Sequence, residues 1–168
     1  MDTDKHVIKK ATIEDAVIMS KIHADSWRAA YKGILPQKQL DELSDEHWVT
    51  FFQEWLERGC IESYIVFIED VAVGCVTCGS IAPECADRNE IISLYILPDY
   101  FGKGIGKVLM HKALELIQKN GFEDAFLWTL KENKRARLFY EKNGFILDDT
   151  GHCERIFDQD AVKYVKYI

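Results

Sequence analysis

The sequence contains no run of apolar residues long enough to cross a membrane as a helix. Its first residues, 1–6, include no apolar segment of the kind found in signal peptides. We therefore expect a cytoplasmic protein with no membrane partner. Basic residues are also in deficit, because 21 Lys and Arg oppose 28 Asp and Glu and leave a net charge of −7. Nucleic-acid binders neutralise phosphates with Lys and Arg, so this balance argues against a nucleic-acid partner.

Cysteine is present five times, an odd number without the spacing of a disulfide-rich scaffold. This usage fits a reducing compartment. Cys75 and Cys78 form a C-x-x-C motif, but they lie in a strand-like run, where side chains three apart point to opposite faces. We therefore predict no metal site, and cysteines without a catalytic role.

Two familiar phosphate-binding loops are also absent, although the chain is rich in glycine around residue 104. A Walker A loop has a glycine five residues before its Gly-Lys pair and a Ser or Thr after it. With Gly106-Lys107 as that pair, these positions hold Phe101 and Val108. The dinucleotide fingerprint G-x-G-x-x-G would need a third glycine at Lys107 or Leu109. Both spacings therefore fail.

The chain has instead a segment of alternating glycines between a strand-like run and a helical pattern. It reads Phe101-Gly102-Lys103-Gly104-Ile105-Gly106-Lys107 and follows the apolar run at 90–97. Glycine permits positive φ and the close approach of a ligand. The first N–H groups of a helix have no partner within it and attract anions. The segment is typical of a phosphate-binding turn, or of a plain glycine-rich surface turn.

Length and hydrophobic periodicity predict one α+β domain over residues 1–168. We expect strands at 7–11, 63–68, 71–76, 90–97, 125–130, 145–147 and 162–168. We expect helices at 12–31, 44–59, 105–120 and 134–143. The spacing of strand, helix and strand between 90 and 130 indicates a parallel crossover, whereas 63–76 reads as an antiparallel hairpin. The sheet is therefore predicted to be mixed.

A second motif, N-K-R-A-R-L-F-Y-E-K-N-G-F at 133–145, follows the glycines. With it, the chain resembles the GNAT superfamily of N-acetyltransferases, most closely over 90–145. The pyrophosphate loop of that family reads Gln/Arg-x-x-Gly-x-Gly/Ala; Gly104 and Gly106 match it, and Phe101 departs from its first position. The resemblance implies a layered α/β/α fold whose mixed, mostly antiparallel sheet has flanking helices and a splayed parallel strand pair.

The resemblance also implies acetyl-CoA as co-substrate. The strand ending at Ile96 would splay from the strand at 128–130, and the amides of pantetheine would pair with the backbone groups left open. The implied CoA-binding residues are Leu94, Tyr95, Ile96, Phe101, Gly102, Lys103, Gly104, Ile105, Gly106, Lys107, Asn133 and Tyr140. For Asn133, an ordinary helix N-cap is the alternative, and one residue can do both.

The implied enzyme is an acyltransferase (EC 2.3.1.-) that transfers acetyl directly to an amine in a ternary complex. Tyr140 matches the general acid that protonates the departing thiolate; its alternative is packing in the core. Glu90 matches a position where many relatives carry a carboxylate base, often acting through water. Its alternative is a solvated strand end.

The acceptor is less defined by the sequence. Trp27 and Tyr31 lie four residues apart on one helix face, where they could bind the acceptor or belong to the core. Such aromatics, with the carboxylates of Asp25, Glu84 or Asp87, would suit a small cationic amine. Alternatives are a protein N-terminus or lysine, a longer acyl-CoA, and a non-catalytic acyl-CoA sensor. The alternating Tyr and Lys of the C-terminal strand suggest an edge for a homodimer.

Overall fold

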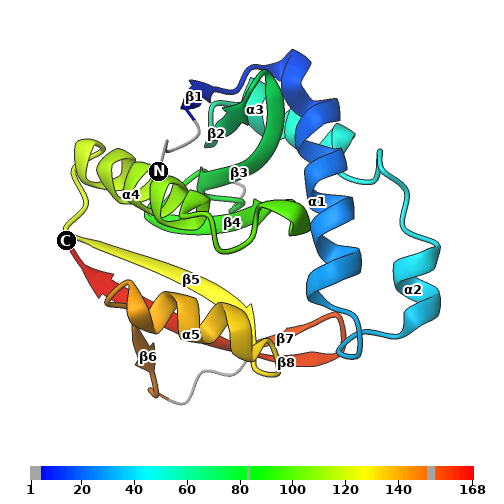
Figure 1. The fold of residues 1–168 in the computed structure, drawn as a ribbon. Coiled ribbons are helices and arrows are strands. Elements are labelled where there is room, and N and C mark those ends of the chain that lie inside the picture. The colour runs from blue at the N-terminus through cyan, green and yellow to red at the C-terminus, as the bar shows by residue number, and fades with distance from the viewer. Residues whose placement is uncertain (1–4, 83, 151–153) are drawn as a thin grey trace.

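The structure is a computed structural model that describes residues 5–82, 84–150 and 154–168. Within these ranges, eight strands form one sheet in the order β1-β2-β3-β4-β5-β8-β6, with β7 paired to β8 (Figure 1). The strands are β1 His6–Lys10, β2 Ile61–Ile68, β3 Val71–Gly79, β4 Glu90–Ile96, β5 Asp124–Leu130, β6 Ile146–Asp148, β7 Glu154–Ile156 and β8 Gln159–Tyr167. The pair β4–β5 is parallel and the other pairs are antiparallel, which confirms the predicted mixed sheet.

Five α-helices occur in the same described ranges, and two of them carry the site. They are α1 Ala16–Ala30, α2 Gln37–Asp41, α3 Val49–Glu57, α4 Ile105–Lys119 and α5 Lys134–Lys142. Thr12 begins the first helical segment as predicted, because its N–H donates to Asp15 Oδ2 at 2.8 Å. The short elements α2 and β7 were not predicted, because five and three residues are too few for a clear hydrophobic period.

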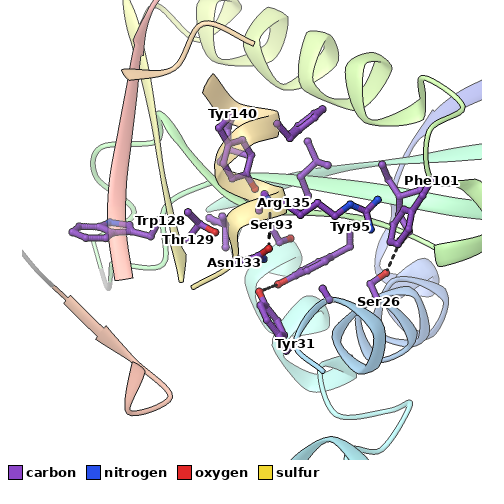
Figure 2. Close-up of a pocket in the computed structure, with 17 residues that line it drawn as sticks. Ser26, Tyr31, Ser93, Tyr95, Phe101, Trp128, Thr129, Asn133, Arg135 and Tyr140 are labelled. Carbon is purple, nitrogen blue, oxygen red and sulfur yellow. Dashed lines mark hydrogen bonds between the residues drawn. The ribbon is translucent and has the colours of Figure 1, made fainter. Parts of the chain in front are cut away.

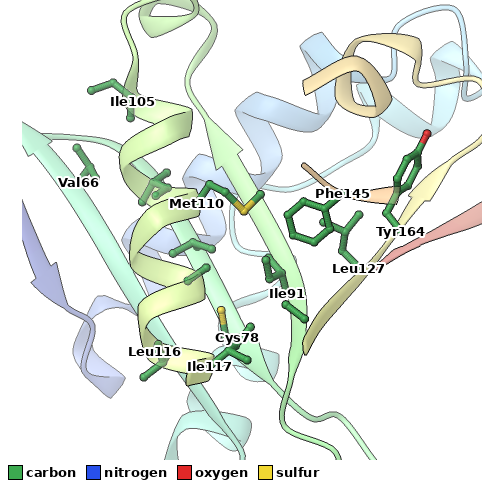
Figure 3. Packing of buried hydrophobic residues seen from close by; sticks show 14 of the residues in the cluster. Val66, Cys78, Ile91, Ile105, Met110, Leu116, Ile117, Leu127, Phe145 and Tyr164 are labelled. Carbon is green, nitrogen blue, oxygen red and sulfur yellow. The ribbon is translucent and has the colours of Figure 1, made fainter. Parts of the chain in front are cut away.

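The alternation of side chains along the central strands creates two apolar layers. One face of the sheet packs against α4, and Figure 3 shows Val66 and Cys78 there with Met110 and Ile117 of that helix. The other face packs against α1 and α3 and includes Cys75. Cys75 and Cys78 thus belong to opposite layers, as the strand period requires.

The sheet opens between β4 and β5, and this opening positions the site. The two strands share a single register pair, Glu90 with Phe126, whereas β5 pairs with β8 along its whole length. A bulge lies where β3 pairs with β4, between Thr77 and Cys78. Beyond Glu90 the two strands diverge, as Figure 1 shows. The predicted splayed parallel pair is confirmed.

The C-terminal strand is covered over most of its length, and the homodimer expected from it stays a prediction. β8 pairs with β5 on one side and with β6 and β7 on the other. On that side β7 pairs with 159–161 and β6 with 163–165, and Lys166 and Tyr167 extend beyond β6 at the C-terminal end. In the described sheet, β6 and not β8 ends the strand order on this side.

The cysteines include one pair that the spacing did not indicate. Cys60, before β2, forms a disulfide with Cys85 in the loop that leads to β4. The free Cys75 and Cys78 are buried, and burial raises the pKa of the Cys75 thiol to about 12. Both thiols are thus kept protonated, which removes them as nucleophiles. Cys153 lies outside the described residues.

In the described part of the chain, no helix is long and apolar enough to span a membrane.

Candidate active site

A cavity of about 170 Å³ occupies the opening between β4 and β5. Its walls come from β4, from the end of β5, from α1 and from the start of α5, as Figure 2 shows. Predicted cofactor residues that line it are Leu94, Tyr95, Ile96, Phe101, Asn133 and Tyr140. Pockets that enclose drug-sized ligands measure about 300–1,000 Å³, so this one would take an acyl-pantetheine end and leave the nucleotide of CoA outside.

The glycine segment lies outside the cavity lining, apart from Phe101. Gly102 and Gly104 have φ of 76° and 82°, and Gly104 is the N-cap of α4. At Gly106 an added Cβ would lie 3.0 Å from Phe139 Cε2, so this glycine lets α4 approach α5 closely. The segment thus presents the free N–H groups of a helix start beside the cavity, which fits the phosphates of CoA.

Asn133 is the N-cap of α5, which was the alternative to a role in cofactor binding. Its Oδ1 accepts a hydrogen bond from the Ala136 N–H at 3.2 Å, at the start of α5. The side-chain NH₂ group is not needed for the cap and remains able to donate to a ligand in the cavity. Capping and cofactor binding are therefore compatible at this residue.

Tyr140 lies on α5 and lines the cavity, while its ring also packs in the core. The rings of Phe139, Phe145 and Tyr164 lie 5.6–6.1 Å from it, centroid to centroid. Burial raises the pKa of the Tyr140 phenol well above its ordinary value. The hydroxyl therefore keeps its proton at neutral pH, which is the state that a general acid requires.

The two predicted acceptor-binding aromatics have different positions. Tyr31 lines the cavity, whereas Trp27 is buried behind it. Trp27 Nε1 donates to Tyr95 Oη at 2.9 Å, and the hydroxyls of Tyr31 and Tyr95 are 3.0 Å apart. Trp27 thus holds the wall in place, and Tyr31 and Tyr95 form its inner surface.

A buried histidine orients the hydroxyl of Ser93, which also lines the cavity. His23 Nδ1 lies 2.9 Å from the Met19 carbonyl, which can only accept, so Nδ1 carries the proton. Burial lowers the pKa of His23 to about 4, so Nε2 is unprotonated at neutral pH and accepts from Ser93 Oγ at 3.0 Å. Because the Ser93 proton points to His23, its oxygen offers lone pairs to the cavity.

Glu90 lies next to the cavity but is not among its lining residues. It is half-buried at the start of β4, adjacent to Ile91, which does line the cavity. Burial raises the pKa of Glu90 to about 7; the negative charge of Glu154 adds to the rise, and Lys163 opposes it. A carboxyl that titrates near neutral pH suits a general base.

Several lining residues were not predicted, namely Ser26, Ser93, Trp128, Thr129, Arg135 and Phe139. Arg135 could have been found from the sequence, because it lies two residues after Asn133 in the motif at 133–145. Ser26 Oγ donates to the Ile96 carbonyl at 3.0 Å and ties α1 to the end of β4.

The carboxylates expected near the acceptor, of Asp25, Glu84 and Asp87, do not line the cavity. That of Asp25 instead pairs with Lys21 and Arg28.

The described residues include no cluster of His, Cys, Asp or Glu that could hold a metal ion. The site consists of backbone from an open sheet, two helix starts and a row of hydroxyls. Such a cavity fits a long, uncharged arm ending in a reactive group, attached to a phosphate-bearing head.

Comparison with known proteins identifies the family of the chain. The model of the Acetyltransferase (GNAT) family matches residues 21–145. The spermidine N(1)-acetyltransferase of Thermoplasma acidophilum is 26% identical over 162 residues, which are 90% of this chain and 95% of that protein. An uncharacterized N-acetyltransferase of Archaeoglobus fulgidus is 34% identical over 147 residues, 86% of this chain and 95% of its own.

Solved structures agree. The PaiA N-acetyltransferase of Thermoplasma acidophilum, in complex with coenzyme A, superposes with a TM-score of 0.73 at 25% identity, covering 95% of this chain and 98% of that one. A GCN5-related N-acetyltransferase from Rhodopseudomonas palustris has a TM-score of 0.76 at 17% identity over nearly all of both chains, and shows the fold alone. The fold and cavity define an acyl-CoA-dependent transferase. The chain belongs to the GNAT family of acetyltransferases, and acetyl-CoA is its co-substrate.

Proposed function

We propose that this enzyme acetylates a primary amine of a small cationic molecule by direct transfer within a ternary complex. One observation carries the proposal: a single cavity joins the strand β4 and Tyr140 to the hydroxyl wall of Tyr31 and Tyr95. Donor and acceptor can therefore meet in one space. Bound acetyl-CoA supplies the activated acetyl group, and attack by the amine nitrogen breaks the thioester C–S bond.

Two residues of the chain carry out the two proton transfers, one to the leaving sulfur and one from the attacking nitrogen. The phenol of Tyr140 holds a proton in the cavity and gives it to the sulfur as the C–S bond breaks. Glu90, beside Ile91 of the lining, takes the proton that the attacking nitrogen must lose, through a water molecule because it does not line the cavity. The free thiols of the described residues, Cys75 and Cys78, are buried and protonated, and direct transfer requires no acyl-cysteine step.

Negative charge beside the cavity, outside its lining, supports a cationic acceptor. The cavity lining contains no carboxylate among its described residues, and a desolvated site favours the neutral, nucleophilic form of an amine. Glu90 and Glu154 lie close enough to interact beside this site, and their negative charge would attract a second amino group. The related protein named spermidine N(1)-acetyltransferase acts, by its name, on such a molecule.

A protein N-terminus is the second candidate acceptor. It is supported by similarity to N-alpha-acetyltransferase 50 of Danio rerio, which is 31% identical over 114 residues, 66% of this chain. An acetyl-CoA-dependent thiol-release screen decides between the two. We expect turnover with diamines and polyamines, and kcat/KM at least about tenfold lower with peptides. Faster turnover with peptides than with every small amine would reverse the assignment.

The ionisation of Glu90 predicts a pH dependence. Since the pKa is raised to about 7, the carboxylate base forms as pH rises through 7, and kcat/KM for the amine should fall on the acid side of that value. Glu90→Gln should lower turnover by roughly 10²-fold and remove this limb. Glu154→Gln is the matched control, because losing its negative charge should move the limb to lower pH without removing it. A limb near pH 7 that persists in Glu90→Gln would rule out Glu90 as the base.

A further inference from the structure

Phe101, the residue that departs from the family's loop pattern, is covered by an arginine from the other side of the cavity mouth. The Arg135 guanidinium carbon lies 3.5 Å from the centroid of the Phe101 ring. Figure 2 shows the two side chains facing each other at one end of the cavity. Arg135 lies in the first turn of α5, and Phe101 begins the glycine segment. The contact therefore links the two helix starts that border the cavity.

Arg135 is also distinct in charge. Among the described residues that line the cavity, it alone carries a charge. Within the described parts of the chain, no acidic residue forms an ion pair with it and no acceptor takes a hydrogen bond from it. Nearby Arg137, by contrast, donates to Tyr164 Oη at 3.0 Å and to the Lys131 carbonyl at 3.1 Å. Apart from the Phe101 ring, Arg135 is thus a cation without an ion-pair or hydrogen-bond partner among the described residues, at one end of the cavity.

The Phe101 ring holds the Arg135 guanidinium in an orientation that can bind an anion. A ring against one face of a guanidinium restricts its plane, while the N–H groups at its edge stay open. Those donors are arranged as a fork that matches two oxygens of a phosphate. The arm of CoA that enters the cavity is uncharged, so the first anionic group outside the mouth is the pyrophosphate.

We propose that Arg135 binds the pyrophosphate of CoA and that Phe101 is the platform that holds it in position. Backbone N–H groups after Phe101 would contact the same anion from the glycine segment. Phe101 then contributes by fixing a cation rather than by donating a hydrogen bond itself. The proposal rests on the use of acetyl-CoA, and it does not depend on which amine is the acceptor.

Binding to three ligands tests this without turnover: CoA, 3′-dephospho-CoA and pantetheine, measured by calorimetry or by competition with CoA. Arg135→Ala should weaken CoA and 3′-dephospho-CoA alike, by about tenfold or more, the usual effect of losing a charge-assisted hydrogen bond. Pantetheine, which lacks phosphate, should bind equally to both proteins. Because Arg135 is exposed, thermal unfolding of the free protein should not change.

Matched variants separate this role from a general effect of positive charge. Lys134→Ala removes the neighbouring exposed cation, which does not line the cavity, and should change CoA binding less than twofold. Phe101→Leu should weaken CoA about threefold in the natural background and not at all in Arg135→Ala. Equal losses in Arg135→Ala and Lys134→Ala, an equal loss for pantetheine, or a loss confined to CoA with its 3′-phosphate would each overturn the proposal.

Discussion

Tyr140→Phe should lower kcat by about 10²- to 10⁴-fold, the usual contribution of a general acid, and leave the Kd for CoA unchanged. The substitution removes one hydroxyl and keeps the ring that packs against Phe139, Phe145 and Tyr164. Because the pKa of Tyr140 is raised, the natural enzyme has its phenol protonated throughout the working pH range. Steady-state kinetics with saturating amine, together with CoA calorimetry, measure the two quantities.

The leaving group provides a sharper test of the same role. An acetyl thioester of an aromatic thiol releases a stable thiolate that needs no proton, so the defect of Tyr140→Phe should largely vanish with it. Tyr100→Phe is the control, because it removes a hydroxyl outside the cavity lining and keeps the ring beneath Lys103. An equal defect with both donors would assign Tyr140 to positioning instead of proton transfer.

The second large effect concerns stability, at Gly79→Ala. Gly79 ends β3 with φ of 142°, and an added Cβ would lie 2.2 Å from the Cys60 carbonyl oxygen and 2.7 Å from Ile61 Cα. Both obstacles are backbone, so the start of β2 or the end of β3 would have to move. Overpacking and backbone strain together should cost about 3 kcal/mol or more. For a domain of this size, that corresponds to a Tm lower by roughly 10 °C.

Gly33→Ala separates the clash from the strain. Gly33 also has positive φ, 80°, but nothing lies within 4 Å of its added Cβ. It should therefore lose only about 1 kcal/mol, the cost of the left-handed conformation for alanine. Thermal and denaturant unfolding of both variants give the comparison. Equal destabilisation at the two sites would show that the contact with Cys60 contributes nothing.

Sequence reasoning succeeded where the chemistry is local. The glycine segment, the motif at 133–145 and the parallel crossover follow from residues close together in the chain, whereas the splaying of the two strands was implied by the family resemblance. Asn133 and Tyr140 could be placed because one short helix carries both. The same locality explains why Thr12 was correctly predicted as a helix start.

What could not be predicted depends on contacts between distant segments. Ser93 reaches His23 across 70 residues, and the local pattern around Ser93 gives no sign of that bond. The pKa of Glu90 is raised first by burial and further by the charge of Glu154, which belongs to a strand of only three residues that the hydrophobic period does not reveal. Trp27 and Tyr31 share a helix face, yet only the fold shows that one lies behind the other.

The opening between β4 and β5 has a consequence for how long the protein survives. Beyond the pair of Glu90 with Phe126, no register pair joins these two strands, so the cofactor occupies a place that a neighbouring strand would otherwise fill. A ligand that binds only the folded chain adds RT ln(1 + [L]/Kd) to its stability, about 2.7 kcal/mol at a hundredfold excess over Kd. The resistance of this protein to unfolding and to proteases should therefore rise with the total concentration of CoA and acetyl-CoA, because both carry the arm that would fill the opening.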